Sequence, residues 1–207
     1  MLSPSVVQSL LILNAASFIF LSLATGKIFE SFALWPLGLT GEEIFRDVAP
    51  RFHFWQLITY SFLHGGIFHL LLNMYALWMF GTRIETAWGS KAFAIYYFVC
   101  VVGAGLVQLY VSSQGVDEGD IYPTVGASGG VFGLLLAYAL TFPNERLMLI
   151  FPPIVLKAKW FVFIFAAVEL YLGVTGTLAG IAHFAHLGGM LFGFLLLLYW
   201  GKHPLKL

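Results

Sequence analysis

Five long stretches of this chain carry no charged side chain, and this pattern limits the folds that it can adopt. The stretches cover residues 1–26, 52–82, 92–116, 121–144 and 170–201. Only 10% of the 207 residues are charged, against roughly 25% in an average soluble domain. A soluble fold of this size could not cover its surface with so few charges. The pattern therefore predicts a protein that crosses a membrane several times.

A helix needs about 20 apolar residues to cross the hydrocarbon layer of a membrane. By this measure we predict helices over residues 6–25, 64–81, 93–111, 128–142, 160–175 and 182–200. The connection over residues 27–63 contains charges of both signs, and we expect it to form an ordered loop at the membrane surface. The prediction is an all-α bundle of six transmembrane helices with an interfacial first loop, forming a single domain over residues 1–207.

The first helix could instead be a secretory signal. Its apolar stretch is longer than the apolar core of a signal peptide, and no cationic segment precedes it. We therefore expect an uncleaved first helix.

Lysine and arginine residues orient the helices, because short loops rich in them stay on the cytoplasmic side. They follow the second, fourth and sixth helices, as Arg83, Lys91, Arg146, Lys157, Lys159, Lys202 and Lys206. The loop after the third helix carries only acids, and the link after the fifth carries no charge. We therefore expect both termini in the cytoplasm, so that the second, fourth and sixth helices begin at the outer face.

These three helices each begin with polar or small residues. The second contains His64, His69 and Asn73, the fourth opens with Gly-Ala-Ser-Gly-Gly at 126–130, and the sixth with Ala-His-Leu-Gly-Gly at 185–189. Polar side chains inside a membrane are costly and mark functional sites. Three such helix starts at similar depth indicate one shared cavity that water can reach.

Ser128 is the candidate nucleophile of this cavity. The glycines around it let a substrate approach its hydroxyl, and a helix start has unpaired N–H groups that can bind an oxyanion. The alternative is a small residue that serves only helix packing. A serine hydroxyl also needs a base to take its proton, and His186 is the candidate base.

Glycine spacing indicates that the fourth and sixth helices lie close together. His186, Gly189 and Gly193 share one face at spacing i, i+3, i+7, and Gly129 and Gly133 form a small-xxx-small pair. Facing glycines let two membrane helices approach closely, as a serine–histidine hydrogen bond of about 2.6–3.2 Å requires. The alternative is a buried histidine that only bonds a neighbour.

No third catalytic residue follows from the sequence. Glu169 is the only acid inside a predicted helix, and no feature of the sequence aims it at His186. We predict a serine–histidine dyad without a carboxylate, in which packing against Phe132 orients the imidazole.

His69 and Asn73 are four residues apart, so they share a helix face. Both can donate hydrogen bonds, which predicts an oxyanion hole; the alternative is a polar pair that joins helices. His64 lies off that face and is assigned to bracing the first loop. A zinc site from His64, His69, His183 and His186 is a further alternative, but neither a carboxylate nor an H-E-x-x-H helix accompanies them. We expect no metal.

Taken together, these motifs resemble those of the rhomboid intramembrane serine proteases. The resemblance covers residues 54–193 and rests on H-x₄-H-x₃-N from His64 to Asn73, Gly126-Ala127-Ser128-Gly129, and Ala185-His186 followed by Gly189 and Gly193. It implies six membrane helices, a catalytic dyad of Ser128 and His186, and an oxyanion site that includes His69 and Asn73. It also implies cleavage of membrane-anchored proteins within or beside their transmembrane segment, without a cofactor.

Two positions depart from the family pattern. Gln56 follows Trp55 where the family often has arginine, so the resemblance does not carry the usual charge-assisted bonds of the first loop over to this chain. Phe132 stands where a tyrosine often follows the serine by four, and it can pack on His186 but cannot hydrogen-bond. Both dyad residues are present, so the chain does not resemble inactive members of the derlin type.

Two other functions could use the same cavity. A membrane chaperone could hold client helices in it, but the serine–histidine pair argues against this. A small transporter would show internal repeats and polar residues at the midplane, which we do not find.

We expect transmembrane-helix substrates and the lipid bilayer as partners, and no nucleic acid, because the net charge is zero. The compact chain favours a bacterial inner membrane.

Overall fold

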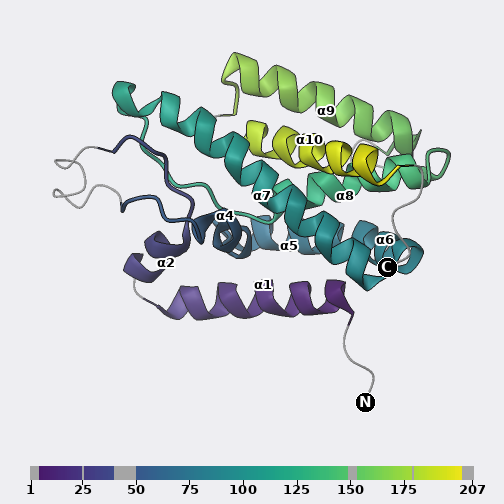
Figure 1. Ribbon diagram of the computed structural model, residues 1–207, viewed down its shortest axis with the longest axis horizontal. Coiled ribbons are helices and arrows are strands. Elements are labelled where there is room, and N and C mark those ends of the chain that lie inside the picture. The colour runs from purple at the N-terminus through teal and green to yellow at the C-terminus, as the bar shows by residue number, and fades with distance from the viewer. Residues whose placement is uncertain (1–4, 25, 40–49, 149–152, 179, 202–207) are drawn as a thin grey trace.

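The computed structural model describes residues 5–24, 26–39, 50–148, 153–178 and 180–201. Most of these residues lie in helices, and the axes of the longer helices are roughly aligned (Figure 1). The longer ones are α1 (Val6–Leu23), α7 (Ser90–Gln114), α8 (Ser128–Thr141), α9 (Ala158–Thr175) and α10 (His183–Trp200). The shorter ones are α2 (Gly26–Phe32), α4 (Gln56–Thr59), η1 (Tyr60–Phe62), α5 (Ile67–Ala76), η2 (Leu77–Gly81), α6 (Thr82–Trp88) and η3 (Val116–Glu118). A two-stranded antiparallel hairpin, β1 (Arg146–Met148) and β2 (Val155–Lys157), joins α8 to α9.

Four of these helices, α1, α7, α9 and α10, are long and apolar enough to cross a membrane. The segments Gln56–Phe62 and Ile67–Trp88 meet the same test as a pair, but a break bends them by 100°. Helix α8 has 14 residues, which is about 21 Å of helix, against roughly 30 Å of hydrocarbon. The prediction of a helical membrane protein is confirmed, whereas six complete spans are not.

The second predicted helix, over residues 64–81, differs from the structure at both ends. Helix α5 begins only at Ile67, because Gly65 and Gly66 have low helix propensity. The helix then continues past residue 81, through the π-helical segment η2, as far as Trp88. The other five helices begin and end within three residues of their predicted bounds.

Polar contacts join the segments at one end of the bundle. Arg83 donates to Glu145 over 2.6 Å, which connects α6 to the segment before the hairpin. The carboxylate of Glu85 accepts from the backbone N–H groups of Val6 and Val7 at 2.8 and 3.0 Å, which connects α6 to the start of α1. The basic residues that follow the second and fourth predicted helices therefore lie at one end.

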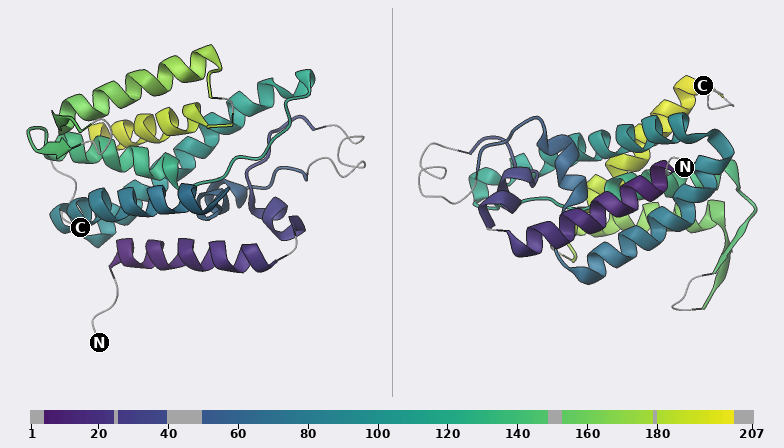
Figure 2. Two further views of the ribbon diagram at one scale, coloured as in Figure 1. Left: turned by 180° about the vertical axis from the view of Figure 1, so that it is seen from behind. Right: turned by 90° about the horizontal axis from the view of Figure 1, so that it is seen from below.

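The first loop and the acidic loop meet at the opposite end. Leu34 forms an isolated β-bridge with Thr124, and the backbone N–H of Leu37 donates to the hydroxyl of Ser113 at 2.7 Å. Figure 2 shows α2 and the segment that follows α7 on the same side of the molecule. This arrangement agrees with the predicted alternation of helices. Lys202 and Lys206 lie outside the described residues, and the cytoplasmic assignment of the basic end stays a prediction.

Gln56, one of the two departures from the family pattern, organises the described part of the first loop. Its side chain is fully buried. The amide oxygen accepts from the backbone N–H groups of Trp35 and His53 at 3.4 and 3.3 Å, and the amide nitrogen donates to the carbonyls of Ser31 and Arg51. Neutral hydrogen bonds therefore occur where an arginine would supply charge-assisted ones.

The bundle is most tightly packed where α7 meets α8 and α10, and Figures 1 and 2 show α10 beside α7, α8 and α9. Tyr96, Tyr97 and Cys100 of α7 are at most 1% exposed. The hydroxyl of Tyr96 donates to the Gly133 carbonyl of α8 at 2.9 Å. A buried hydrogen bond of this kind fixes neighbouring helices, because no water replaces it if it breaks. Helices α8 and α10 carry the polar residues Ser128 and His186, and their packing against α7 holds them in place.

Candidate active site

The starts of α8 and α10 bring Ser128 and His186 together, as the sequence predicted. The Oγ atom of Ser128 lies 2.8 Å from Nε2 of His186, although the residues are 58 positions apart. Ser128 is the first residue of α8, and His186 lies in the first turn of α10. The distance is that of a hydrogen bond between a nucleophile and its base.

Glycines permit this approach of α8 and α10. A Cβ atom on Gly189 would collide with the carbonyl of Gly129, and one on Gly133 would lie 3.2 Å from the Gly189 carbonyl. The predicted contact between these three glycines is therefore present. Gly193, predicted to face α8 as well, instead abuts the hydroxyl of Tyr96 in α7. Helix α10 thus uses one glycine-rich face for two neighbours.

The imidazole of His186 is held on two sides. The ring of Phe132 stacks on it with centroids 4.1 Å apart and planes 4° from parallel, as predicted. In addition, Nδ1 of His186 lies 2.9 Å from Oε2 of Glu169 in α9. The prediction of a histidine without a carboxylate partner is therefore wrong.

Topology explains the position of Glu169. Consecutive helices joined by a short link are antiparallel neighbours, so an acid in the last two turns of α9 can meet histidines in the first turn of α10. His183 and His186 are three residues apart and share a face of α10. Nδ1 of His183 also lies 2.7 Å from Oε2 of Glu169. The short link thus brings Glu169 near the start of α10, but it does not define which face of α9 turns toward His186.

Glu169, His183 and His186 are also the residues that could hold a metal ion, since their ligand atoms lie within 4.8 Å of one another. Two of these residues belong to the predicted zinc alternative, while His64 and His69 lie apart from the group. The same atoms already hydrogen-bond to each other, and Nε2 of His186 faces Ser128. Among the described residues these three side chains and Ser128 thus form one connected hydrogen-bond network.

The ring of His69 lies against the glycine two residues before Ser128. Its Nδ1 accepts from the backbone N–H of Gly65 at 3.4 Å, so the neutral ring carries its hydrogen on Nε2. Nε2 lies against Gly126, where a Cβ atom would be only 2.8 Å away. Gly126 has a φ of +127°, which side chains rarely adopt. Both facts make a glycine necessary two residues before Ser128.

Asn73 and His64 occupy the same region. The Asn73 amide donates to the carbonyl of His69 at 2.9 Å, and an amide has a second N–H for another acceptor. His64 is 5% exposed, and its ring meets the ring of His69 edge-on with centroids 5.0 Å apart. Its role in bracing the first loop stays a prediction.

One cavity of about 1010 Å³ connects these groups. His69, Asn73, Ser128 and His186 all line it. It extends between α5 and α9, where its walls are mainly apolar and include Leu72, Tyr75, Ala76, Phe161 and Phe165. The cavity thus joins a small polar site to an apolar groove between two helices.

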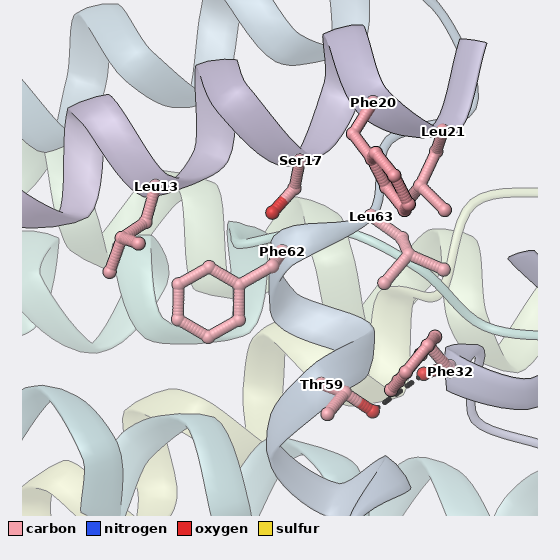
Figure 3. A pocket seen from close by; sticks show the side chains of 8 residues that line it. All are labelled: Leu13, Ser17, Phe20, Leu21, Phe32, Thr59, Phe62 and Leu63. Carbon is pink, nitrogen blue, oxygen red and sulfur yellow. Dashed lines mark hydrogen bonds between the residues drawn. The ribbon is translucent and has the colours of Figure 1, made fainter. Parts of the chain in front are cut away.

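A second pocket, of about 420 Å³, lies between α1, Phe32 at the end of α2 and residues 59–63. Figure 3 shows its lining: Leu13, Ser17, Phe20, Leu21, Phe32, Thr59, Phe62 and Leu63. The hydroxyl of Thr59 already donates to the Phe32 carbonyl at 2.8 Å. None of the described residues that line this pocket has a titratable side chain.

Comparison with known proteins gives one family. Residues 51–203 match the family model described as Rhomboid domain. The chain is 34% identical over 142 residues to the human "Presenilin-associated rhomboid-like protein, mitochondrial". The aligned segment covers 64% of this chain and 34% of the human protein. The chain is 33% identical over 178 residues to "RHOMBOID-like protein 1" of Arabidopsis thaliana (81% and 41%), and 30% identical over 141 residues to "Rhomboid protein 1, mitochondrial" of Saccharomyces cerevisiae (68% and 40%). The chain therefore spans between a third and two fifths of the length of these relatives.

Proposed function

The chain belongs to the rhomboid family, and on this basis we propose that it is an intramembrane serine endopeptidase. Its substrates are membrane-anchored proteins, cleaved within or next to their transmembrane segment. The observation that carries the proposal is the distance of 2.8 Å between Ser128 Oγ and His186 Nε2. Helix packing alone does not require a base beside a serine.

In the proposed reaction Ser128 attacks the scissile carbonyl, and Nε2 of His186 takes the hydroxyl proton. His186 then gives this proton to the leaving amine, which releases the first product and leaves an acyl-enzyme. A water molecule, activated by the same base, hydrolyses the acyl-enzyme and restores the serine. The serine–histidine contact supports both halves of this cycle.

The tetrahedral intermediate carries a negative oxygen that needs hydrogen-bond donors. Nε2 of His69, the second N–H of Asn73 and the backbone N–H of Ser128 at the start of α8 are the proposed donors. The first N–H groups of a helix have no carbonyl partner within it, and they favour negative charge. The position of His69 against Gly126 supports this assignment.

The short length of α8 supports hydrolysis inside the membrane. If the last turn of α8 lies near one surface, about 21 Å of helix ends several ångströms short of the other. Ser128 would then lie below the surface, within reach of water through the cavity. The apolar groove between α5 and α9 offers a route by which a substrate helix enters from the lipid.

A fluorophosphonate probe, which reacts with activated serines, tests the proposal. We expect the purified wild-type protein to be labelled at Ser128 and the Ser128→Ala variant to remain unlabelled. Incubation with a panel of single-span substrates, followed by mass analysis, should give products cut within or beside the membrane segment. Absence of both labelling and cleavage would favour a membrane chaperone that only holds client helices.

Replacement of Asn73 by alanine is expected to lower kcat about 10²-fold with little change in KM. The reason is that an oxyanion donor acts only after the carbonyl has been attacked. Asn14→Ala is the matched control, because Asn14 is also buried and donates to its own helix carbonyl, that of Leu10, at 2.8 Å. Steady-state cleavage of a reconstituted substrate measures both constants. If the two substitutions lowered kcat equally, Asn73 would not be a donor of the oxyanion site.

The long apolar helices support an integral membrane protein. Two of the relatives compared above carry the word mitochondrial in their names, so a bacterial inner membrane is not favoured by the comparisons. Cytoplasmic termini and a single domain over residues 1–207 also stay predictions. Fractionation of cells that express the natural protein would assign the membrane.

A further inference from the structure

We infer that Glu169 is a positioning residue for the base His186, and that His183 holds Glu169 in place. The inference rests on the proposed proteolytic function. It starts from one oxygen atom, Oε2 of Glu169, which lies within hydrogen-bond distance of two imidazoles, 2.7 Å from His183 and 2.9 Å from His186.

The hydrogen atoms on His186 decide whether it can act as a base. To accept the proton of Ser128, Nε2 must carry a lone pair, so the single hydrogen of the neutral ring must be on Nδ1. An ionised carboxylate can only accept hydrogen bonds. Glu169, at Nδ1, therefore stabilises the one tautomer that leaves Nε2 free for the serine.

His183 has acceptors at both ring nitrogens. Nδ1 faces Oε2 of Glu169, and Nε2 lies 3.3 Å from the carbonyl of Thr177. A hydrogen on Nδ1 of His183 lets this ring donate to the carboxylate of Glu169, which gives the buried acid one partner. A buried charge in a membrane protein needs such a partner.

The pair also fixes the direction of the carboxylate. Glu169 and His183 are 9% and 5% exposed, so water hardly competes for these bonds. With His183 bound at one lone pair of Oε2, the other lone pair remains for His186. Phe132 stacks on the ring face of His186, and Glu169 binds its edge. The two contacts together fix the tilt of the ring and its rotation in its own plane.

Glu169→Gln tests this role, since it keeps the size and removes the charge. We expect kcat to fall about 10²-fold with KM unchanged within about twofold. The loss should be smaller than the roughly 10⁴-fold known for such a change in a serine protease triad, because Phe132 still orients the ring. Glu169→Asp keeps the charge, and its kcat should be about tenfold higher than that of Glu169→Gln.

A spectroscopic measurement separates positioning from a merely structural role. In protein with ¹⁵N-labelled histidine, His186 of the wild type should show the Nδ1–H tautomer, and Glu169→Gln should show a mixture of both tautomers. Glu85→Gln is the matched control. Glu85 is also buried, at 7% exposed, and accepts two backbone N–H groups. Its substitution should lower the unfolding temperature and leave kcat and the tautomer unchanged.

Three outcomes would overturn the inference. Glu169→Gln could retain wild-type kcat, could act only through KM or the unfolding temperature, or could leave the His186 tautomer unchanged. Failure of the proposed function is distinguishable, because it would appear as a wild-type protein without fluorophosphonate labelling or cleavage. The tautomer measurement needs no catalytic activity and tests the hold of Glu169 on His186 in either case.

Discussion

Replacement of Ser128 or His186 by alanine is expected to lower kcat by about 10⁵–10⁶-fold while the protein stays folded. Nucleophile and base act as one unit, so the loss of either removes the activated hydroxyl. The variant that lacks both side chains should for the same reason be no slower than either single variant. Cleavage of a single-span substrate in reconstituted vesicles, followed over days for the slow variants, gives the three rates.

Ser112→Ala is the control for the loss of a hydroxyl inside the bundle. Ser112 is 5% exposed and donates to the Leu109 carbonyl of its own helix at 3.3 Å. Its removal should leave kcat unchanged. Thermal unfolding should show that the Ser128 and His186 variants remain folded. Wild-type activity of Ser128→Ala on a purified substrate would refute the mechanism. If the fold loss of kcat in the double variant equalled the product of the two single losses, the residues would not act as a pair.

Gly189→Ala is expected to damage stability and catalysis together. The added Cβ would collide with the carbonyl of Gly129, which is backbone and cannot rotate away. Helices α8 and α10 would have to separate next to the Ser128–His186 hydrogen bond. Overpacking of this kind costs about 3 kcal/mol, and a misplacement of about 1 Å costs about 10²-fold in rate. We therefore expect kcat to fall by more than about 10²-fold.

Gly105→Ala makes the same change in a neighbouring helix and serves as the control. Its Cβ would lie 3.2 Å from side-chain atoms of Leu57 and Tyr60, so it needs a shift of only a few tenths of an ångström and meets no backbone atom closer than 3.6 Å. Unfolding measurements and single-turnover cleavage should show a small effect for Gly105→Ala and a large one for Gly189→Ala. Similar effects of both would mean that the contact of α8 with α10 is not the critical one.

Helix positions and the residues that begin them could be predicted well, since both are local properties. The unbroken apolar stretches defined five of the six predicted helices to within three residues. The error at the second helix arose because hydropathy cannot separate the Gly-Gly break at 65–66 from the apolar helix after it. The predicted fourth helix, over residues 128–142, was already shorter than a full span requires.

The sequence by itself determined a helical membrane protein, its family motifs, and the pairing of Ser128 with His186 across glycine faces. Only the tertiary structure decided that Glu169 meets His186, that Gly193 faces α7, and that Gln56 bonds backbone groups of the first loop. The physical reason is that a helix apolar on all sides has no amphipathic pattern to define which face turns inward. Its rotation about its own axis is set by packing against neighbours, and that rotation decides which polar side chains meet.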